Sequence, residues 1–300
     1  MEDLDLSDHR VTSEVHVFSE GESLKNEENI VISSFNFSLP PKLALSATHN
    51  ANQETTADDD GDLLVCRKDF TPDFTLSIKH HINTSLDMVG LQVWRGAFLL
   101  ADFLLHSATN EDKNLKIFHD DIVIELGAGT GLTSIVAGMV AGHVVSTDIS
   151  KGNILSLIET NIEQNSKWIS GQVEAIELDF YNSNYSDKLV SLIENSNLLI
   201  AADVVYHDEL TDAFLSTLKR LMVTGRPKTA VIALEKRFVF TLADLDIEAP
   251  CYDYFHENLL RELNAYDILQ LDTSQIPQYF CYERVKELVL FKIQNKSSLP

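Results

Sequence analysis

Residues 122–132 read I-V-I-E-L-G-A-G-T-G-L, and this segment is the most informative part of the chain. An apolar run ends in an acid, passes through three glycines at alternate positions, and leads into apolar residues at helical spacing from Leu132 to Val140. A second apolar run then ends in Asp148, 17 residues after Gly131. The order predicts a strand, a tight turn that a ligand can approach closely, a crossover helix and a second, parallel strand.

The spacing of the three glycines distinguishes between classes of nucleotide ligand. Gly127, Gly129 and Gly131 read G-x-G-x-G, whereas a dinucleotide site reads G-x-G-x-x-G and would need glycine where Leu132 stands. The loop contains no basic residue, which excludes a P-loop. Glu125, an acid just before the glycine loop, suits a ligand with a free amino group and a sulfonium, and Asp148 is placed to accept hydrogen bonds from a ribose diol. The pattern therefore predicts S-adenosylmethionine as the cofactor.

Acids also follow the next two predicted strands. Asp179 and Phe180 come after residues 173–178, and the segment D-V-V-Y at residues 203–206 follows the apolar run 198–202. In an open α/β sheet, ligands bind at the carboxyl ends of the strands near the point where the strand order reverses. We therefore expect these acids to lie close to Glu125 and Asp148 at one edge of the sheet.

Four segments in order carry a resemblance to a known family. E-L-G-A-G-T-G-L at residues 125–132 resembles motif I of the seven-β-strand (class I) methyltransferases. With V-W-R-G-A at residues 93–97, D-V-V-Y after the fourth strand and E-K-R at residues 235–237, the chain resembles the protein-lysine methyltransferase group of that superfamily, methyltransferase family 16. The resemblance covers roughly residues 61–293.

The resemblance implies roles for individual residues. The glycines let the backbone approach the methionyl and ribose parts of the cofactor, Asp179 accepts from the adenine amino group, and Phe180 packs on the ring, where family members often carry tryptophan. Trp94 is either a core residue or a wall of the cofactor pocket. Asp203 and Tyr206 are the expected catalytic residues, facing both cofactor and acceptor. The expected cofactor-binding residues are Trp94, Glu125, Gly127, Gly129, Gly131, Asp148, Asp179, Phe180 and Asp203.

The net charge of the chain limits the classes of partner that it can bind. With 46 acidic and 23 basic residues the chain has a formal charge of −23. Phosphate binding needs a basic surface, so we expect no direct nucleic-acid ligand. An acidic protein attracts and steers basic partners, which is compatible with a protein substrate that has a basic target region.

The cysteines and the hydropathy of the chain indicate the cellular compartment in which the protein is expected. Cys66, Cys251 and Cys281 are odd in number and lack metal-ligand spacing, so they predict free thiols in a reducing compartment and no metal site. No apolar run reaches the roughly 18 residues of a membrane helix, and the acidic first 30 residues do not resemble a signal peptide. We expect a soluble intracellular monomer of the nucleus or cytoplasm, with no membrane partner.

The chain divides by composition near residue 62. Residues 1–62 hold 14 acidic against three basic residues, and we expect a weakly ordered acidic appendage there. Two stretches in it, residues 11–18 and 30–37, contain alternating apolar residues, and we expect them to pair as a small β unit laid against the catalytic domain. Residues 63–300 form the S-adenosylmethionine-dependent methyltransferase domain.

Strands and helices alternate through that domain, which predicts an α/β fold with a doubly wound, mostly parallel seven-stranded sheet of Rossmann-like methyltransferase type. The expected strands are residues 122–126, 143–147, 173–178, 198–202, 230–235, 265–271 and 287–293, preceded by a strand at 75–82. The expected helices are residues 92–105, 152–165, 185–194 and 210–221.

Together these features predict an enzyme that transfers a methyl group from S-adenosylmethionine to a lysine side chain of a protein. A class I methyltransferase acting on protein histidine, protein arginine or a small molecule stays open, because motif I does not separate these acceptors; only D-V-V-Y and E-K-R favour lysine. A non-catalytic binding module would be signalled by loss of a loop glycine or of Asp148, and the sequence retains them all.

Overall fold

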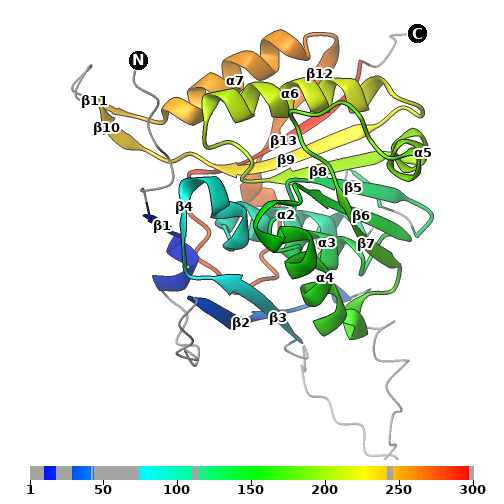
Figure 1. Cartoon of the computed structure of the whole chain (residues 1–300), viewed down its shortest axis with the longest axis vertical. Coiled ribbons are helices and arrows are strands. Elements are labelled where there is room, and N and C mark those ends of the chain that lie inside the picture. Colours follow the sequence, from blue (N-terminus) through cyan, green and yellow to red (C-terminus); the bar gives the residue numbers. More distant parts are fainter. Residues whose placement is uncertain are drawn as a thin grey trace, which may run out of the picture.

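A seven-stranded sheet forms the centre of the protein (Figure 1). The computed structural model describes residues 10–17, 29–41, 43, 74–109, 115–117, 119–241 and 246–296. The strand order is β12-β13-β9-β8-β5-β6-β7, in which β5 to β9 run parallel and β13 is antiparallel to both of its neighbours, β9 and β12. The strands are β5 (Ile122–Leu126), β6 (His143–Asp148), β7 (Gln172–Glu177), β8 (Leu198–Ala202), β9 (Thr229–Glu235), β12 (Tyr266–Leu271) and β13 (Leu288–Asn295).

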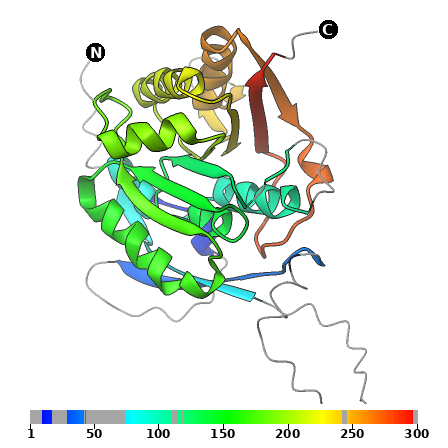
Figure 2. The ribbon, with the colours of Figure 1, turned by 90° about the vertical axis from the view of Figure 1, so that its right-hand side faces the viewer.

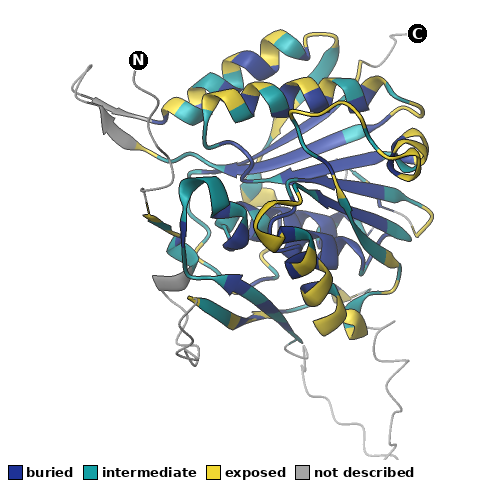
Figure 3. Ribbon diagram, in the orientation of Figure 1, coloured by how far each residue is buried: buried dark blue, intermediate teal, exposed yellow. Residues whose placement is uncertain are grey.

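Helices cover both faces of this sheet (Figure 1). One face carries α2 (Arg95–Ser107), α3 (Leu132–Ala137) and α4 (Ile154–Gln164), and the other carries α5 (Asp187–Asn195), α6 (Asp208–Val223) and α7 (Pro250–Glu262). The central strands are buried along most of their length, as parallel strands covered on both faces must be (Figure 3). The predicted doubly wound, mostly parallel seven-stranded α/β fold is confirmed.

The bounds of most elements lie within two or three residues of the predictions. Two helices differ for local reasons. The helix predicted over residues 92–105 begins at Arg95, because Gln92 and Trp94 have extended backbones. Helix α3 ends at Ala137, where Gly138 packs so closely against Val173 that a Cβ would lie 2.4 Å from its side chain. Helix α7 was not predicted, although Pro250 at its start and apolar residues at helical spacing are a usable signal.

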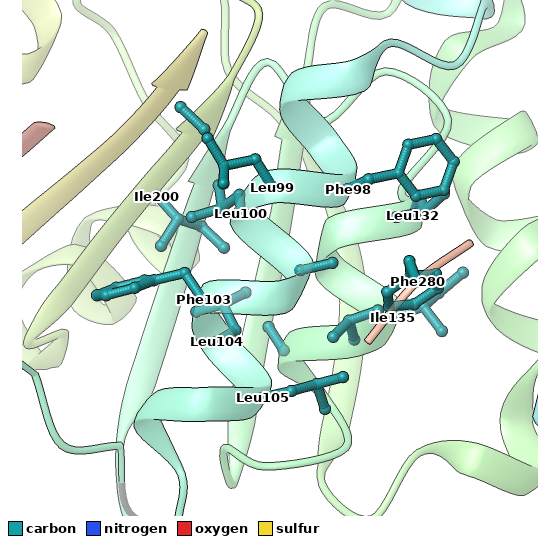
Figure 4. Packing of buried hydrophobic residues seen from close by; sticks show 14 of the residues in the cluster. Phe98, Leu99, Leu100, Phe103, Leu104, Leu105, Leu132, Ile135, Ile200 and Phe280 are labelled. Carbon is teal, nitrogen blue, oxygen red and sulfur yellow. The ribbon is translucent and has the colours of Figure 1, made fainter. Parts of the chain in front are cut away.

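Helix α2 is the centre of the core on its face of the sheet (Figure 4). Leu99, Leu100 and Phe103 lie on the side of Ile200 in β8, and Phe98 packs against Phe280 with ring centroids 5.8 Å apart. These six residues are at most 2% exposed. Helix α2 is therefore packed tightly against the central strands of the sheet.

Helix α2 contains one buried acidic residue, Asp102, whose carboxylate is bound by residues near the C-terminal end of the chain. Asp102 is 0% exposed, and its carboxylate accepts hydrogen bonds from the backbone N–H groups of Tyr279 (2.7 Å) and Phe280 (2.9 Å). Arg284 forms an ion pair with it at 2.5 Å. A buried carboxylate needs partners of this kind, since an unpaired buried charge is costly.

Within the described parts of the chain, one helical stretch, Leu86–Ser107, is long and apolar enough by composition to cross a membrane, with a mean hydropathy of 1.4. It consists of a 3₁₀ helix, η2 (Leu86–Leu91), and α2, and 72% of its most apolar window is buried inside the protein. It is therefore part of the hydrophobic core described above.

The N-terminal strands pair with the domain and not with each other. Strand β1 (Arg10–Thr12) is antiparallel to β4 (Asn83–Ser85), and β2 (Ile30–Phe37) is antiparallel to β3 (Phe74–His81). The expected pairing of residues 11–18 with residues 30–37 is therefore wrong. Figure 2 shows β2 and β3 on the outer side of the layer formed by α2, α3 and α4.

Strand β2 packs on the domain through one face, because its buried and exposed side chains alternate. Its inward side chains Ser33, Phe35 and Phe37 are buried, and Phe37 stacks on Phe280 with ring centroids 4.9 Å apart. The backbone N–H of Cys281 also donates to the carbonyl of Asn36 at 3.0 Å. Residues 30–37 thus belong to the hydrophobic core of the domain. Cys66 lies outside the described residues, and the division of the chain at residue 62 stays a prediction.

Candidate active site

A cavity of about 370 Å³ lies at the carboxyl ends of β5 to β8, where the strand order reverses. It brings together eight of the nine predicted cofactor-binding residues and both predicted catalytic residues. We call it the first cavity. Of the predicted residues, those that line it are Trp94, Glu125, Gly127, Gly129, Asp148, Asp179, Phe180, Asp203 and Tyr206.

The glycine turn makes the floor of the first cavity. Gly127 and Gly129 have φ of +67° and +57°, a left-handed conformation that side chains disfavour. A Cβ on Gly127 would lie 2.7 Å from Val204 Cγ1, and one on Gly129 would lie 2.7 Å from the carbonyl oxygen of Gly90. Both positions therefore require glycine, and the bare backbone they leave faces the cavity.

Gly131 has a different reason to be glycine. It is the residue before α3, with φ of +77°, and it does not line the cavity. A Cβ there would lie 3.1 Å from Ile158 Cγ2 in α4. Gly131 thus lies at the start of α3 and close to α4. Since it does not line the cavity, its expected role in cofactor binding stays a prediction.

Asp148 closes the turn from the end of β6. Its Oδ2 accepts from the backbone N–H of Gly129 and its Oδ1 from that of Ile149, each at 2.8 Å. Burial raises the pKa of Asp148 to about 6, against the lowering effect of the two N–H groups. The carboxylate lines the cavity and keeps lone pairs for further donors, as a ribose-binding acid must.

Glu125 lies beneath the turn. It is 1% exposed and accepts a hydrogen bond from the hydroxyl of Ser134 in α3. Burial raises its pKa to about 8, so the group is largely protonated at neutral pH. This bond joins the end of β5 to α3 below the glycine loop.

Asp203 is held by the backbone on two sides. Its Oδ2 accepts from Gly96 N at 2.7 Å, at the start of α2, and its Oδ1 accepts from Glu235 N at 3.0 Å, at the end of β9. Its φ of 52° is in the left-handed region that aspartate tolerates better than most residues. The carboxylate thus positions three elements of the site, a task that sequence reasoning did not assign to it.

Tyr206 and Trp94 form a wall of the cavity. Burial raises the pKa of the Tyr206 phenol, and the nearby Asp148 carboxylate adds to the effect, so the phenol stays protonated. Trp94 is half-buried and donates from Nε1 to the carbonyl of Val89 at 2.9 Å. Of the two alternatives left open for Trp94, the pocket wall describes its place better than the core.

The opposite end of the cavity is polar and aromatic. Asp179 Oδ1 accepts from the backbone N–H of Tyr181 at 2.9 Å, which fixes the turn after β7. Phe180 packs on Phe214 of α6 with ring centroids 5.5 Å apart. Both line the cavity, and their roles towards an adenine ring stay predictions.

Sequence reasoning missed several residues of this site. Lys151 and Asp87 line the cavity and form an ion pair at 2.7 Å, and Gly90, Glu177 and Tyr181 line it too. Asp87 and Gly90 come from η2, Lys151 from η3 (Lys151–Asn153), Glu177 from the end of β7 and Tyr181 from the turn after it. Only Glu177 had a signal, as an acid near a strand end; the others reach the site through the tertiary fold.

A second cavity of about 260 Å³ adjoins the first. The two share the lining residues Val89, Trp94, Asp203 and Tyr206, which therefore form the wall between them. From that wall the second cavity extends over the end of β9, where it is lined by Glu235 and Arg237. Glu235 pairs with Arg95 at 2.9 Å, and the Arg237 guanidinium lies 4.6 Å from the centre of the Trp94 ring.

The comparisons with known proteins agree with this geometry. A family model described as "Lysine methyltransferase" matches residues 71–245. Methyltransferase-like protein 22 of Mus musculus is 35% identical over 242 residues, which cover 74% of this chain and 60% of that protein. The Homo sapiens protein of that name is 34% identical over 257 residues, covering 79% and 62%.

A third relative is the protein-lysine methyltransferase METTL21E of Bos taurus, 30% identical over 169 residues that cover 52% of this chain and 55% of that protein. The family resemblance inferred from motif I and the three accompanying segments is confirmed. Residues 238–242, 249–255 and 282–284 favour methyltransferase-like protein 22 within the group, and that likeness is confirmed as well. The chain spans 60% and 62% of the length of these two relatives.

Proposed function

Since this chain belongs to the lysine methyltransferase family, we propose that it transfers a methyl group from S-adenosylmethionine to a lysine side chain of a protein. One observation carries the proposal: a glycine-floored cavity with an acid at the ribose position adjoins a second cavity across the wall of Trp94, Asp203 and Tyr206. Such a pair of cavities suits a reaction in which cofactor and acceptor enter from opposite sides.

The first cavity fits the proposed cofactor. Gly127 and Gly129 present bare backbone to the cavity at positions where a Cβ would collide with Val204 and Gly90, and Asp148 offers carboxylate oxygens to hydroxyl donors. We assign the adenine end to Asp179 and Phe180, because they line the cavity on the far side of Asp148 from Asp203. The methionyl end is then nearest to Trp94 and Asp203, beside the second cavity.

The chemistry divides between cofactor and protein. Bound S-adenosylmethionine would supply a methyl group on a positively charged sulfur; a neutral amine would take that methyl group as the carbon–sulfur bond breaks and the sulfur leaves as the thioether S-adenosylhomocysteine. The protein's tasks are to position the amine and to favour its neutral form, since deprotonating an ordinary lysine at pH 7 costs roughly 4 to 5 kcal/mol. Tyr206 is half-buried at the wall and stays a phenol, so it can orient the amine without taking its proton. Asp203 positions the wall through its two backbone hydrogen bonds.

The proposal extends to the substrate and the setting of the enzyme. The net charge of −23 favours a target lysine in a basic region of a protein, because opposite charges steer association. The two cysteines within the described part of the chain, Cys251 and Cys281, are free thiols, which suits a reducing compartment such as nucleus or cytoplasm. A monomeric enzyme and the absence of a direct nucleic-acid ligand stay predictions from the sequence.

The test is methyl labelling of a cell extract. The full chain is incubated with extract and tritiated S-adenosylmethionine, and the labelled protein is identified by mass spectrometry and hydrolysed for amino-acid analysis. Methyllysine is the expected product. The matched control is Asp148→Ala, which removes the acid assigned to the ribose and should abolish labelling.

The acceptor alternatives are decided by the same hydrolysate. Methylhistidine or methylarginine without methyllysine would overturn the lysine assignment while leaving a methyltransferase. An absence of any labelling, together with no binding of S-adenosylhomocysteine in calorimetric titration, would overturn the methyltransferase assignment itself.

A further inference from the structure

The N-terminal segment reaches the second cavity. Val11, Thr12 and Glu14 line it, although the other described lining residues lie at positions 86 and beyond. The segment is fixed by Ser13, which is 0% exposed: its backbone N–H donates to Gln92 Oε1 at 2.8 Å, and its hydroxyl donates to the carbonyl of Val93 at 2.5 Å. Glu14, the next residue, is therefore held directly before α2, beside the wall of the site.

Two carboxylate oxygens at this cavity are buried without a hydrogen-bond partner. They are Glu14 Oε2 and Glu235 Oε2. The Glu235 side chain is only 9% exposed, and its other oxygen is taken by Arg95. A buried acceptor without a partner costs roughly 1–3 kcal/mol, so such atoms in a cavity call for a donor that the protein does not supply.

The balance of charge indicates which kind of donor. Glu14, Asp203 and Glu235 line the cavity, against Arg237 from the lining and Arg95 paired with Glu235. These are three carboxylates and two guanidinium groups, an excess of one negative charge. The Arg237 guanidinium is held over Trp94 with its Nη2 3.9 Å from Asp203 Oδ1, and its Nε and Nη2 are also buried without a hydrogen-bond partner, so it donates to neither orphan oxygen. A further cation would serve the two orphan oxygens and offset the excess of negative charge.

The remaining lining is apolar and suits a hydrocarbon chain behind that cation. Leu86, Val89, Val205, Leu234 and Tyr252 contribute it. A lysine side chain has this composition, a flexible four-carbon stem that packs on apolar surface and an ammonium that donates three hydrogen bonds.

We propose that the second cavity receives the side chain of the acceptor lysine, and that Glu14 of the N-terminal segment and Glu235 accept hydrogen bonds from its ammonium group. This inference rests on the proposed function. It makes the segment before β2 part of the acceptor site, where Glu14 and Glu235 bind the arriving ammonium group beside the shared wall.

The test uses a ligand that spans both cavities, so no substrate protein is needed. The probe is a cofactor analogue with an adenosine and amino-acid part and an aminoalkyl arm at the position of the transferable methyl group. Its control is the same compound with an alkyl arm of equal length in which methylene replaces the amine. Calorimetric titration of the full chain measures both, together with S-adenosylhomocysteine as the reference without an arm.

We expect wild type to bind the aminoalkyl analogue at least about tenfold more tightly than the alkyl one, as a charge-assisted hydrogen bond provides. Glu14→Gln should remove most of that ratio and leave the affinity for S-adenosylhomocysteine unchanged; Glu235→Gln should act likewise. Glu159→Gln, an exposed carboxylate on α4, should keep the full ratio.

The outcomes separate the two proposals. An unchanged ratio in both Glu14→Gln and Glu14→Ala, with a cooperative thermal transition in each, would overturn the role of Glu14. Failure of wild type to bind S-adenosylhomocysteine would overturn the proposed cofactor, and with it the proposed function. Normal binding of that compound with no preference for the amine would overturn the acceptor-site inference alone.

Discussion

The carboxylate of Asp203 lies against the backbone of Gly96, with 2.7 Å between Asp203 Oδ2 and Gly96 N. A Cβ on Gly96 would lie 2.5 Å from the same oxygen, closer than real Cβ atoms come to any neighbour. The relationship joins two of the segments that identify the family, V-W-R-G-A before α2 and D-V-V-Y after β8. Position 96 requires glycine because the carboxylate of Asp203 occupies the space that a Cβ would need.

Gly96→Ala should destabilise the protein. The added methyl group has to push Asp203 or the start of α2 aside, and overpacking of this kind costs about 1–3 kcal/mol. Urea denaturation of both proteins measures the difference. Gly90→Ala is the control, because a Cβ there meets its nearest atom at an ordinary 3.4 Å. Equal unfolding free energies for Gly96→Ala and wild type would show that the contact is not as tight as described.

Asp203→Asn should lower stability although it keeps the shape of the side chain. Both carboxylate oxygens accept from backbone N–H groups, and an amide has one oxygen, so its NH₂ must face one of these donors. Leaving a buried donor unpaired costs about 1–3 kcal/mol. Asp179→Asn is the matched control, because only one of its oxygens accepts a described backbone bond. The assignment fails if chemical denaturation finds the two variants equally stable.

Phe37→Ala should destabilise the domain by about 3–5 kcal/mol, the usual cost of truncating a buried phenylalanine. Phe37 is 2% exposed and stacks on Phe280, whereas Ile32 in the same strand is 45% exposed and serves as the control in Ile32→Ala. A chain starting at Gly61 lacks the whole of β2 and should lose still more. Thermal unfolding of the three proteins tests this, and an unshifted transition in the shortened chain would contradict the place of β2 in the core.

Glu125→Gln should change how stability depends on pH. Burial raises the folded-state pKa of Glu125 from 4.5 to about 8, so between these values the folded protein binds more protons than the unfolded chain. The contribution of Glu125 to stability is therefore present below pH 4.5 and is lost as the pH rises through about 8. Glutamine does not titrate. Over this window the unfolding free energy of wild type should fall relative to that of the variant.

The comparison requires the same titration for both proteins, because Asp102, Asp148 and Glu235 also have pKa values raised to about 6 and contribute to each curve. Subtracting the two series of urea midpoints removes that shared part. Glu159→Gln, which removes an exposed carboxylate on α4, is the control for the loss of one negative charge. Parallel curves for Glu125→Gln and wild type would mean that Glu125 is not protonated in the folded state.

Local patterns in the sequence were sufficient to predict the class of fold and the floor of the site. Strand periodicity and glycine spacing are local signals, because they follow from which side of a strand is buried and which backbone angles a turn needs. Strands β5 and β8 therefore have the predicted bounds, and Gly127, Gly129 and Asp148 lie together as expected.

The contacts between segments far apart in the sequence could be learned from the folded protein alone. The alternation in residues 30–37 predicted a strand with one buried face, but nothing local told that its partner is β3 and that Phe37 stacks on Phe280. The two bonds of Asp203 and the arrival of Glu14 beside Glu235 depend in the same way on where the chain returns. Side-chain patterns encode burial, whereas contacts across the fold are set by the packing of all the elements at once, which no single stretch of sequence contains.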